Sequence, residues 1–374
     1  MKVEQHLLDR AAPLHNTRLA DAQLVLVFGS APLLAQAPLE SWRALWPKAF
    51  FVGCGSSGEI YNERVHEQHL TLTAVELERS HLAFARAAAT SGDDGRACGA
   101  SLGLALPPEE LRHVFVLCDG LRCNPSALLH GLTDTLPEGV TISGGLASNE
   151  LTFSQTPILA NSLPDDHCAV AVGFYGEALK IGQGTQSGWD GFGPDRLVTR
   201  ARGNTLYELD GESALKLYQR YLGEQAGALP ASAQRYPLAQ LAASPWGAHL
   251  TRNILSFNAQ EGSFQLCGSI AEGSSVRMLR AVPEHLIRAA HNAAVDSQLT
   301  GSRTPALAIV VSGIGRRLTL GLRAEEELEE IRRTLGAQMA ASGFYSYAQL
   351  APLSSNMACE VHGQSISITS FDEV

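Results

Sequence analysis

The sequence predicts a mixed α/β fold made of two related mixed-sheet units flanked by helices. In the opening region, buried strand runs alternate with a short helical stretch, as in a βαβ unit. Later in the first half, several strand runs follow one another without a helix between them, which indicates antiparallel pairing. The order strand, turn and helix then recurs in the second half. These three observations favour an α+β architecture with a possible internal duplication.

Apolar, β-prone runs define the expected elements of the first half. QLVLVFGS (23–30) and FFVGCGSS (50–57) are predicted strands on either side of a short helix over 37–47. The neighbouring runs over 70–77 and 81–89 predict a hairpin. The remaining elements expected here are a polar loop over 91–96 followed by a helix to about 106, a strand over 113–120, a helix over 125–136, a strand over 140–145, and strands in TPILAN, HCAVAVGFY and ALKIGQGTQ.

The chain changes character around 188–211, and we place a domain boundary near 195–225. The preceding stretch GQGTQSGWDGFGP (182–194) matches no nucleotide-binding glycine motif, so we interpret it as a connecting loop that packs Trp189 and Phe192. The elements expected afterwards are a helix over 214–223, a linker over 227–239, strands in ILSF and SFQLCGSI, a helix over 283–297, a strand over 306–313, a helix over 323–335 and a closing hairpin.

Two pairs of segments indicate the internal duplication. FFVGCGSSGE resembles FQLCGSIAEGSS, because each is a strand that runs into a Cys-Gly-Ser turn. HVFVLCDGLRCNPSALL resembles ALAIVVSGIGRRLTLGL in its order of strand, turn and helix. The spacing is uneven and the identities are few, so duplication of one α/β unit is a hypothesis.

The composition excludes several classes of function. The chain of 374 residues has a formal net charge of −10 and no basic block, which argues against a nucleic-acid or anionic-membrane surface. No apolar run approaches the length of a membrane span, and MKVEQHLLDRAAPLHN lacks the apolar core of a secretory signal, so we expect a cytoplasmic protein. The seven cysteines contain no CxxC pair, which favours reduced thiols over disulfides or structural zinc.

The motif GCGSSGE (53–59) is the first candidate site. It offers a thiol (Cys54), two hydroxyls (Ser56 and Ser57) and backbone N–H groups at the end of a strand, where open sheets commonly bind ligands. Cys54 as a nucleophile would need a nearby base or cation, and no histidine is close in sequence. The plainer alternative is a tight turn with a buried cysteine.

A second group of candidates lies in the second half. Arg316 and Arg317 follow a buried strand, where a guanidinium can hold a carboxylate, and we select Arg316. Tyr345 and Tyr347 are one residue apart, so one is expected to face a pocket while the other faces away. In CEVHGQSISIT, His362 is expected at the tip of the closing hairpin, either as a turn residue beside Gly363 or as a ligand.

The order of several motifs resembles the FIST proteins, which are bacterial sensory proteins with an N-terminal and a C-terminal FIST region. These motifs are GCGSSGEI, GWDGFGPDRLVTRARGNTLYELDGESALKLYQRYLG, VSGIGRR, GFYSYAQLAPL and EVHGQSISIT. The resemblance covers roughly residues 20 to 370 and implies a FIST N-terminal domain over 20–200 and a FIST C-terminal domain over 215–370. The chain departs from the family at Ala348-Gln349-Leu350, where Gly-Glu-Ile is common, and at Gly363, where Asn follows the histidine.

The resemblance implies a non-enzymatic, ligand-sensing protein of signal transduction. Stand-alone members resemble haem-based nitric-oxide sensors, which implies haem b on His362 and regulation of a separate histidine kinase or cyclic-di-GMP enzyme. The other histidines considered as iron ligands are His113, His249, His285 and His291. Since little chain follows Ser370, we expect a signal to act on a separate protein.

Two other functions remain open. An amino acid or other small carboxylate metabolite is the alternative ligand, with Arg316 on its carboxylate and Tyr345 or Tyr347 completing the site. An acyl-transfer enzyme that uses Cys54 is the third hypothesis, for which the sequence identifies neither a base nor an oxyanion hole.

Overall fold

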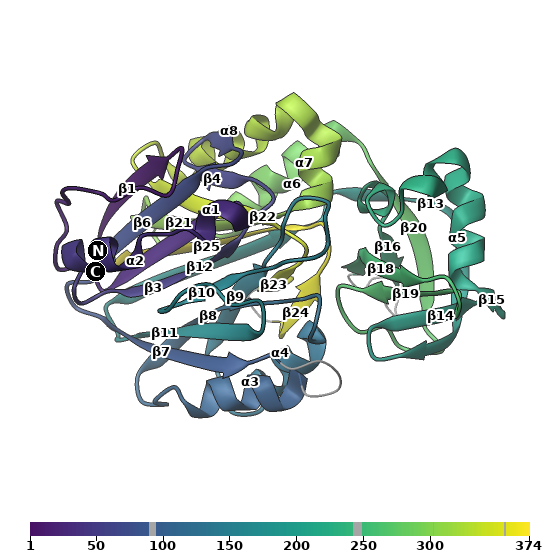
Figure 1. Cartoon of the computed structure of the whole chain (residues 1–374), viewed down its shortest axis with the longest axis horizontal. Helices are drawn as coiled ribbons and strands as arrows, with labels where there is room; N and C mark the ends of the chain where they lie inside the picture. The colour runs from purple at the N-terminus through teal and green to yellow at the C-terminus, as the bar shows by residue number, and fades with distance from the viewer. Residues whose placement is uncertain (90–94, 242–248, 302, 355–356) are drawn as a thin grey trace.

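The computed structural model describes residues 1–89, 95–241, 249–301, 303–354 and 357–374. It confirms the mixed α+β class, with parallel and antiparallel strands in the same sheets. A large layered body carries both termini, and a smaller lobe made of residues 189–281 lies beside it (Figure 1). In the described part of the chain, no helix has the length and apolarity required to cross a membrane.

The body is built from three copies of one β-α-β unit. In the first, β2 (Leu24–Gly29) and β3 (Phe50–Gly55) are parallel and are joined through α1 (Ala31–Leu34) and α2 (Leu39–Leu45). In the second, β8 (Leu111–Cys118) and β9 (Thr141–Leu146) are parallel and are joined through α4 (Pro125–Thr133). In the third, β21 (Leu307–Gly313) and β22 (Ala340–Ser346) are parallel and are joined through α7 (Ile314–Leu320) and α8 (Ala324–Leu335).

The strands around each parallel pair also repeat. An antiparallel strand flanks the first strand of each pair, and another antiparallel strand follows at the edge. These flanking strands are β6 (Leu70–Glu76) with β1 (Lys2–Leu8), β11 (Cys168–Tyr175) with β7 (His81–Ala88), and β25 (Ile366–Glu373) with β12 (Leu179–Gln186). The duplication that the sequence indicated thus occurs three times, and its HVFVLCDG and ALAIVVSG segments are two of the three equivalent strands.

The three units exchange strands in a ring. After its parallel pair, each unit sends one strand into the sheet of another unit. The exchanged strands are β4 (Glu59–Tyr61), which pairs with β22 of the third unit, β10 (Ile158–Ala160), which pairs with β3 of the first, and β23 (Gln349–Pro352), which pairs with β9 of the second. Two hairpin partners, β5 (Arg64–His66) and β24 (Cys359–His362), extend these additions.

A glycine at the same position of the second parallel strand in each unit shows that the three units are equivalent. A Cβ atom at Gly53 would lie 1.7 Å from the carbonyl oxygen of Val27 on the neighbouring parallel strand. At Gly144 and Gly343 the same atom would lie 1.8 Å from the carbonyl oxygens of Val116 and Val310. Only glycine allows the two backbones to approach this closely.

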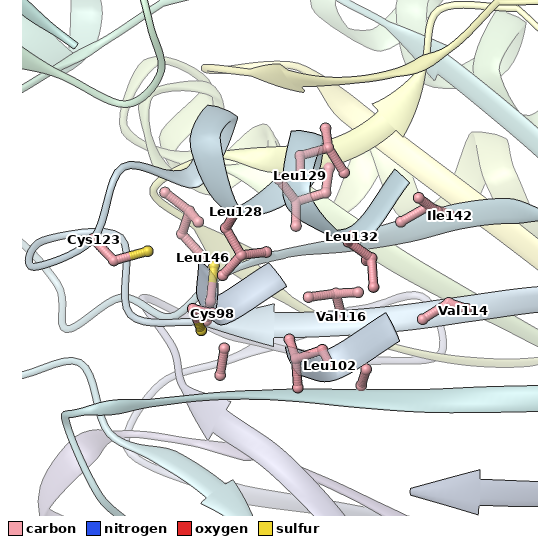
Figure 2. Close-up of a cluster of buried hydrophobic side chains, with 14 of the residues drawn as sticks. Cys98, Leu102, Val114, Val116, Cys123, Leu128, Leu129, Leu132, Ile142 and Leu146 are labelled. Atoms are coloured by element: carbon pink, nitrogen blue, oxygen red, sulfur yellow. The ribbon is translucent and has the colours of Figure 1, made fainter. Parts of the chain in front are cut away.

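Helices cover the outer faces of the sheets. In the second unit, α3 (Gly95–Leu104) packs on α4 and contacts β7 and β11, and Leu102, Val116 and Leu132 are fully buried in the core that these elements share with β8 (Figure 2). The third unit packs α6 (Pro283–Asp296) and α8 over β21 and β25, with an alanine-rich face of α6 in the interface. Burial of each large apolar side chain contributes about 1.5–3 kcal/mol to folding.

The smaller lobe has its own sheet and core. Its sheet has the order β17-β16-β20-β13-β14-β19-β18, and α5 (Ala214–Leu222) packs on it. The strands are β13 (Trp189–Arg202), β14 (Thr205–Leu209), β16 (Leu238–Gln240), β17 (Leu250–Arg252), β18 (Ile254–Asn258), β19 (Ser263–Leu266) and β20 (Ser275–Ala281), with the short β15 (Glu212–Ser213) beside β14; the 3-10 helices are η1 (Gly223–Ala228) and η2 (Ser232–Arg235), and η3 (Gly321–Arg323) lies in the body. The lobe is therefore an insertion between β12 and α6 of the third unit.

Three sequence predictions about local structure were wrong. The runs over 70–77 and 81–89 form strands but no hairpin, because β6 pairs with β1 and β2 while β7 pairs with β11 in another sheet. The stretch 182–194 belongs mostly to β12 and β13, so it is not a connecting loop. FQLCGS begins on β19 of the lobe and continues past the end of that strand, outside the repeat. The polar loop predicted over 91–96 falls largely outside the described residues.

The prediction of a closing hairpin around His362 was also wrong. β24 ends at His362 and pairs with β23, whereas the following β25 pairs with β12 and β21 in a different sheet. The chain therefore crosses between sheets at Gly363, and the residue with positive φ is Gln364, at 58°. His362 is consequently the last residue of a buried strand and does not occupy a hairpin tip.

Candidate ligand-binding site

The loops that follow β3, β9 and β22 meet where the three units join. The Ser57 N–H donates to the Tyr345 carbonyl at 3.0 Å, and the Tyr345 N–H donates to the Gly58 carbonyl at 2.9 Å. The Ser148 N–H donates to the Gly55 carbonyl at 2.9 Å, and the Ser148 hydroxyl donates to the Tyr345 carbonyl at 2.6 Å. Backbone bonds thus join all three units at this point.

This meeting point brings together four of the predicted site residues. Ser56 and Ser57 lie in the first loop, Tyr345 lies at the end of β22, and Tyr347 follows that strand; all four are almost completely buried. The Tyr347 hydroxyl donates to the Glu150 carbonyl at 3.1 Å and accepts from the Asn149 N–H at 3.3 Å. These hydrogen bonds are all made to other parts of the protein. The four residues therefore form the buried wall of the site, and its open surface is formed by other residues.

The open part of the site is a groove of ≈ 490 Å³ beside α7. Arg317 reaches it from the first turns of α7, and its guanidinium donates to the Ser57 carbonyl and to the Glu67 carboxylate. The Arg317 side chain is 19% exposed, whereas that of Glu67 is 66% exposed. The other lining residues are Glu150, Leu151, Ile314, Leu318, Gly321 and Leu322.

The groove therefore combines three chemical groups. A partly buried guanidinium can bind a carboxylate in a bidentate geometry. Two carboxylates, Glu67 and Glu150, can attract an ammonium group, and the leucines offer apolar surface. Burial lowers the pKa of Arg317, with Tyr345 and Glu59 opposing the shift, so an anion in the groove stabilises a guanidinium that is only partly solvated.

Arg316, the arginine selected from the sequence, lies away from this groove. Its guanidinium donates to the Glu327 carboxylate and to the Leu286 carbonyl, and both side chains of the ion pair are 0% exposed. Consecutive helical residues point in directions about 100° apart, which places Arg316 in the core and Arg317 at the groove. The carboxylate that Arg316 holds in this structure is that of Glu327.

Glu59 lies behind Arg317 and is 1% exposed. Its carboxylate accepts from the Ser56 hydroxyl at 2.7 Å and from the His69 N–H at 3.3 Å. Burial raises the pKa of Glu59 to about 7, although these bonds and Arg317 act in the opposite direction. The carboxyl is therefore partly protonated near neutral pH.

The raised pKa of Glu59 predicts a loss of stability as pH rises. The folded protein keeps this proton between pH 4.5 and about 7, where the unfolded chain has lost it, so the free energy of unfolding falls across that window and is lowest above it. Glu59→Gln imitates the protonated form and is expected to be more stable than the wild type at pH 8 by about 2–3 kcal/mol. Urea denaturation at pH 5 and pH 8 measures this difference.

Glu40→Gln is the matched control, because the Glu40 side chain is 87% exposed. It is expected to leave the pH dependence of unfolding unchanged. An equal offset between Glu59→Gln and the wild type at both pH values would contradict the prediction.

Cys54 lies at 0% exposure inside the core between β3 and the neighbouring sheets. Burial raises the pKa of this thiol well above its usual range. A thiol that stays protonated is a poor nucleophile, so the geometry gives no support to acyl transfer at Cys54.

His362 is 1% exposed, and its Nε2 lies 3.0 Å from the Ala351 carbonyl oxygen. Burial and the nearby Arg252 lower the pKa of His362 to about 3. An iron on Nε2 would have to replace the Ala351 contact inside closely packed strands. In this conformation the surroundings of His362 do not fit haem, and haem ligation stays a prediction of the resemblance.

The other histidines considered as iron ligands either contact polar groups of the protein or are buried. Both ring nitrogens of His113 are within 2.9 Å of hydroxyl oxygens, on Thr141 and Ser143. His285 contacts Asp190, and His291 contacts Thr334. The Nε2 atom of His249 is buried without a hydrogen-bond partner among the described residues. In the described part of the chain, no group of three metal-ligating side chains gathers.

The sequence analysis did not identify Glu67 or Glu150, and it selected Arg316 where the groove contains Arg317. Glu150 could have been found, because it stands six residues after Gly144 as Glu59 stands six after Gly53. Gln349 has the same spacing from Gly343 and completes the set. Glu67 carries no such signal, since it approaches Arg317 only through the tertiary fold.

Comparison with known proteins identifies two family models in this chain. The FIST N domain model matches residues 23–212, and the FIST C domain model matches residues 214–352. A search of curated proteins found no match.

Two solved structures show weak likenesses to the chain. A cyanuric acid hydrolase from A. caulinodans is 10% identical with a TM-score of 0.32, over 99% of this chain and 98% of that one. PurLQS from Thermotoga maritima is 7% identical with a TM-score of 0.20, over 85% and 74%. Likenesses of this strength carry no argument about function.

Proposed function

This chain belongs to the FIST family, whose domains are sensory domains of signal transduction, and from that premise we propose that it senses a small carboxylate metabolite in the groove beside α7. An amino acid is the ligand class that suits the groove best. The observation that carries the proposal is the Arg317 guanidinium, which is anchored to the Ser57 carbonyl and opens into a groove that also holds two carboxylates.

Each part of an amino acid has a matching group. The ligand carboxylate would replace Glu67 on Arg317, since the Glu67 side chain is exposed and can move into solvent. The ammonium group would lie near Glu150, and an apolar side chain would contact Leu151, Leu318 or Leu322. A volume of ≈ 490 Å³ is within the range of small-molecule pockets.

Binding in the groove can also affect the rest of the protein. Arg317 connects α7 to the loop after β3, so its partner decides how these two elements are held together. A ligand that binds one arrangement better shifts the population toward it, which is how a sensor reports occupancy. The resemblance to stand-alone members supports a separate signalling enzyme, such as a histidine kinase or a cyclic-di-GMP enzyme, as the receiver.

The test is a titration of the full chain with the common amino acids and small dicarboxylates. At least one is expected to bind and to raise the melting temperature, with a stabilisation of about 2.7 kcal/mol when its concentration is 100 times Kd. Arg317→Gln is expected to weaken that ligand about tenfold or more, and Arg317→Lys to restore part of the affinity. Calorimetry measures both.

Arg333→Gln is the control, because the Arg333 side chain is 71% exposed and lies outside the groove. If Arg317→Gln binds the ligand as tightly as the wild type, the ligand does not bind in this groove and the proposal is contradicted. A stoichiometric Soret band on adding haem b, shifted by nitric oxide and lost in His362→Ala, would favour the haem hypothesis in its place.

A further inference from the structure

We propose a second ligand site between α7 and the smaller lobe, which takes a small organic anion that carries a flat ring. The cavity measures ≈ 540 Å³ and is lined by Phe192, Arg235, Tyr236, Arg280, Ala281, Leu318 and Thr319. It shares the lining residue Leu318 with the groove of Arg317, and the proposal does not depend on the function proposed for that groove.

The charge of this cavity is unusual for the protein. The chain carries a net charge of −10, yet the cavity is lined by two arginines and by no carboxylate. Arg280 is exposed, and no ion pair to it exists among the residues that the structure describes. Its cross-strand neighbour Asp190 contacts His285 at 2.8 Å. The guanidinium of Arg280 is thus available to an anion from solution.

The second arginine is anchored at the wall of the cavity. The Arg235 guanidinium donates to the Leu318 carbonyl at the end of α7 at 3.2 Å, which uses one of its five donors. The remaining donors can reach a phosphate or carboxylate group placed between Arg235 and Arg280. Guanidinium groups bind both kinds of anion in a bidentate manner, so the shared chemistry is an oxyanion.

Two aromatic side chains can recognise the flat ring of the ligand. Phe192 on β13 and Tyr236 after η2 are half-buried, with ring centroids 6.3 Å apart and an interplanar angle of 65°. Half-buried rings beside a cationic wall can stack on a flat ligand ring while the anionic group reaches the arginines. A nucleoside monophosphate and an aromatic carboxylate are the two sources of such a ligand.

The site contacts the same helix as the groove of Arg317. Leu318 of α7 lines both cavities. The Thr319 hydroxyl, also at this cavity, is a buried atom without a hydrogen-bond partner among the described residues. Both cavities therefore border α7.

Calorimetry on the full chain tests the proposal with AMP and benzoate as probes. At least one is expected to bind, AMP more tightly than adenosine or inorganic phosphate alone, because ring and anion both contribute. Arg280→Gln is expected to weaken binding about tenfold or more. Arg280 is exposed and unpaired among the described residues, so this variant is expected to fold normally.

Arg277→Gln is the matched control, because Arg277 lies on the same strand but pairs with Asp195. It is expected to bind the probe like the wild type, and so is Arg317→Gln. Binding of AMP alone identifies a phosphate ligand, and binding of benzoate alone identifies a carboxylate. The proposal is overturned if neither probe binds at millimolar concentrations, or if Arg277→Gln weakens binding as much as Arg280→Gln.

Discussion

Gly343→Ala is expected to destabilise the protein by about 4 kcal/mol or more, which is a large part of the stability of an ordinary domain. The added Cβ atom would lie 1.8 Å from the Val310 carbonyl oxygen, and that atom belongs to the backbone of the adjacent parallel strand. The clash cannot be relieved by turning a side chain. The β21 and β22 backbones would have to separate, which breaks the ladder between them.

Urea denaturation of Gly343→Ala against the wild type measures this effect. Gly227→Ala is the control, because a Cβ atom there meets nothing within 4 Å and the residue is exposed. Gly53→Ala and Gly144→Ala should behave like Gly343→Ala, since the three glycines are equivalent. A loss of less than about 1 kcal/mol in Gly343→Ala would show that the strands are not packed as described.

Arg316→Ala is expected to cost about 3–5 kcal/mol, because it leaves the Glu327 carboxylate buried without its cation. Both side chains are 0% exposed, and burial raises the pKa of Glu327 while Arg316 opposes the shift. The double variant Arg316→Met/Glu327→Leu is expected to recover most of the loss, since neither charge then remains in the core.

Chemical denaturation of Arg316→Met, of Glu327→Leu and of the double variant gives the coupling energy of the pair. Arg317→Gln, one residue further along α7, serves as the comparison and is expected to cost much less, because the Arg317 side chain is partly exposed. A stability of Arg316→Ala close to that of the wild type would mean that the pair is not formed.

The sequence predicted most elements of the body because their cause is local. β2, β8 and β21 each contain an uninterrupted apolar run of at least five residues, and such runs predict strands without reference to the rest of the chain. Their pairing could not be read in this way. The β6 and β7 strands are adjacent in sequence, yet each finds its partner in a different sheet through contacts far along the chain.

The candidate site was predicted in part for the same reason. Ser56, Ser57, Tyr345 and Tyr347 stand at strand ends, and strand ends of equivalent units meet at one place. Which of two consecutive arginines faces the groove depends on the rotation of α7, and the sequence has no signal for it. The position of His362 depends on which sheet each flanking strand enters, so local turn chemistry misled the prediction.

The exchange of strands among the three units has a consequence for how the chain is synthesised. Glu59 pairs in register with Phe344, so the first unit releases a strand whose partner emerges from the ribosome almost 300 residues later. The second unit likewise leaves β9 without its β23 neighbour until residue 349 has appeared. The first and second units therefore carry an open sheet edge during translation, and such edges can pair with the wrong chain. The native strand pairing of the body is therefore complete only when the last strands of the chain have been made.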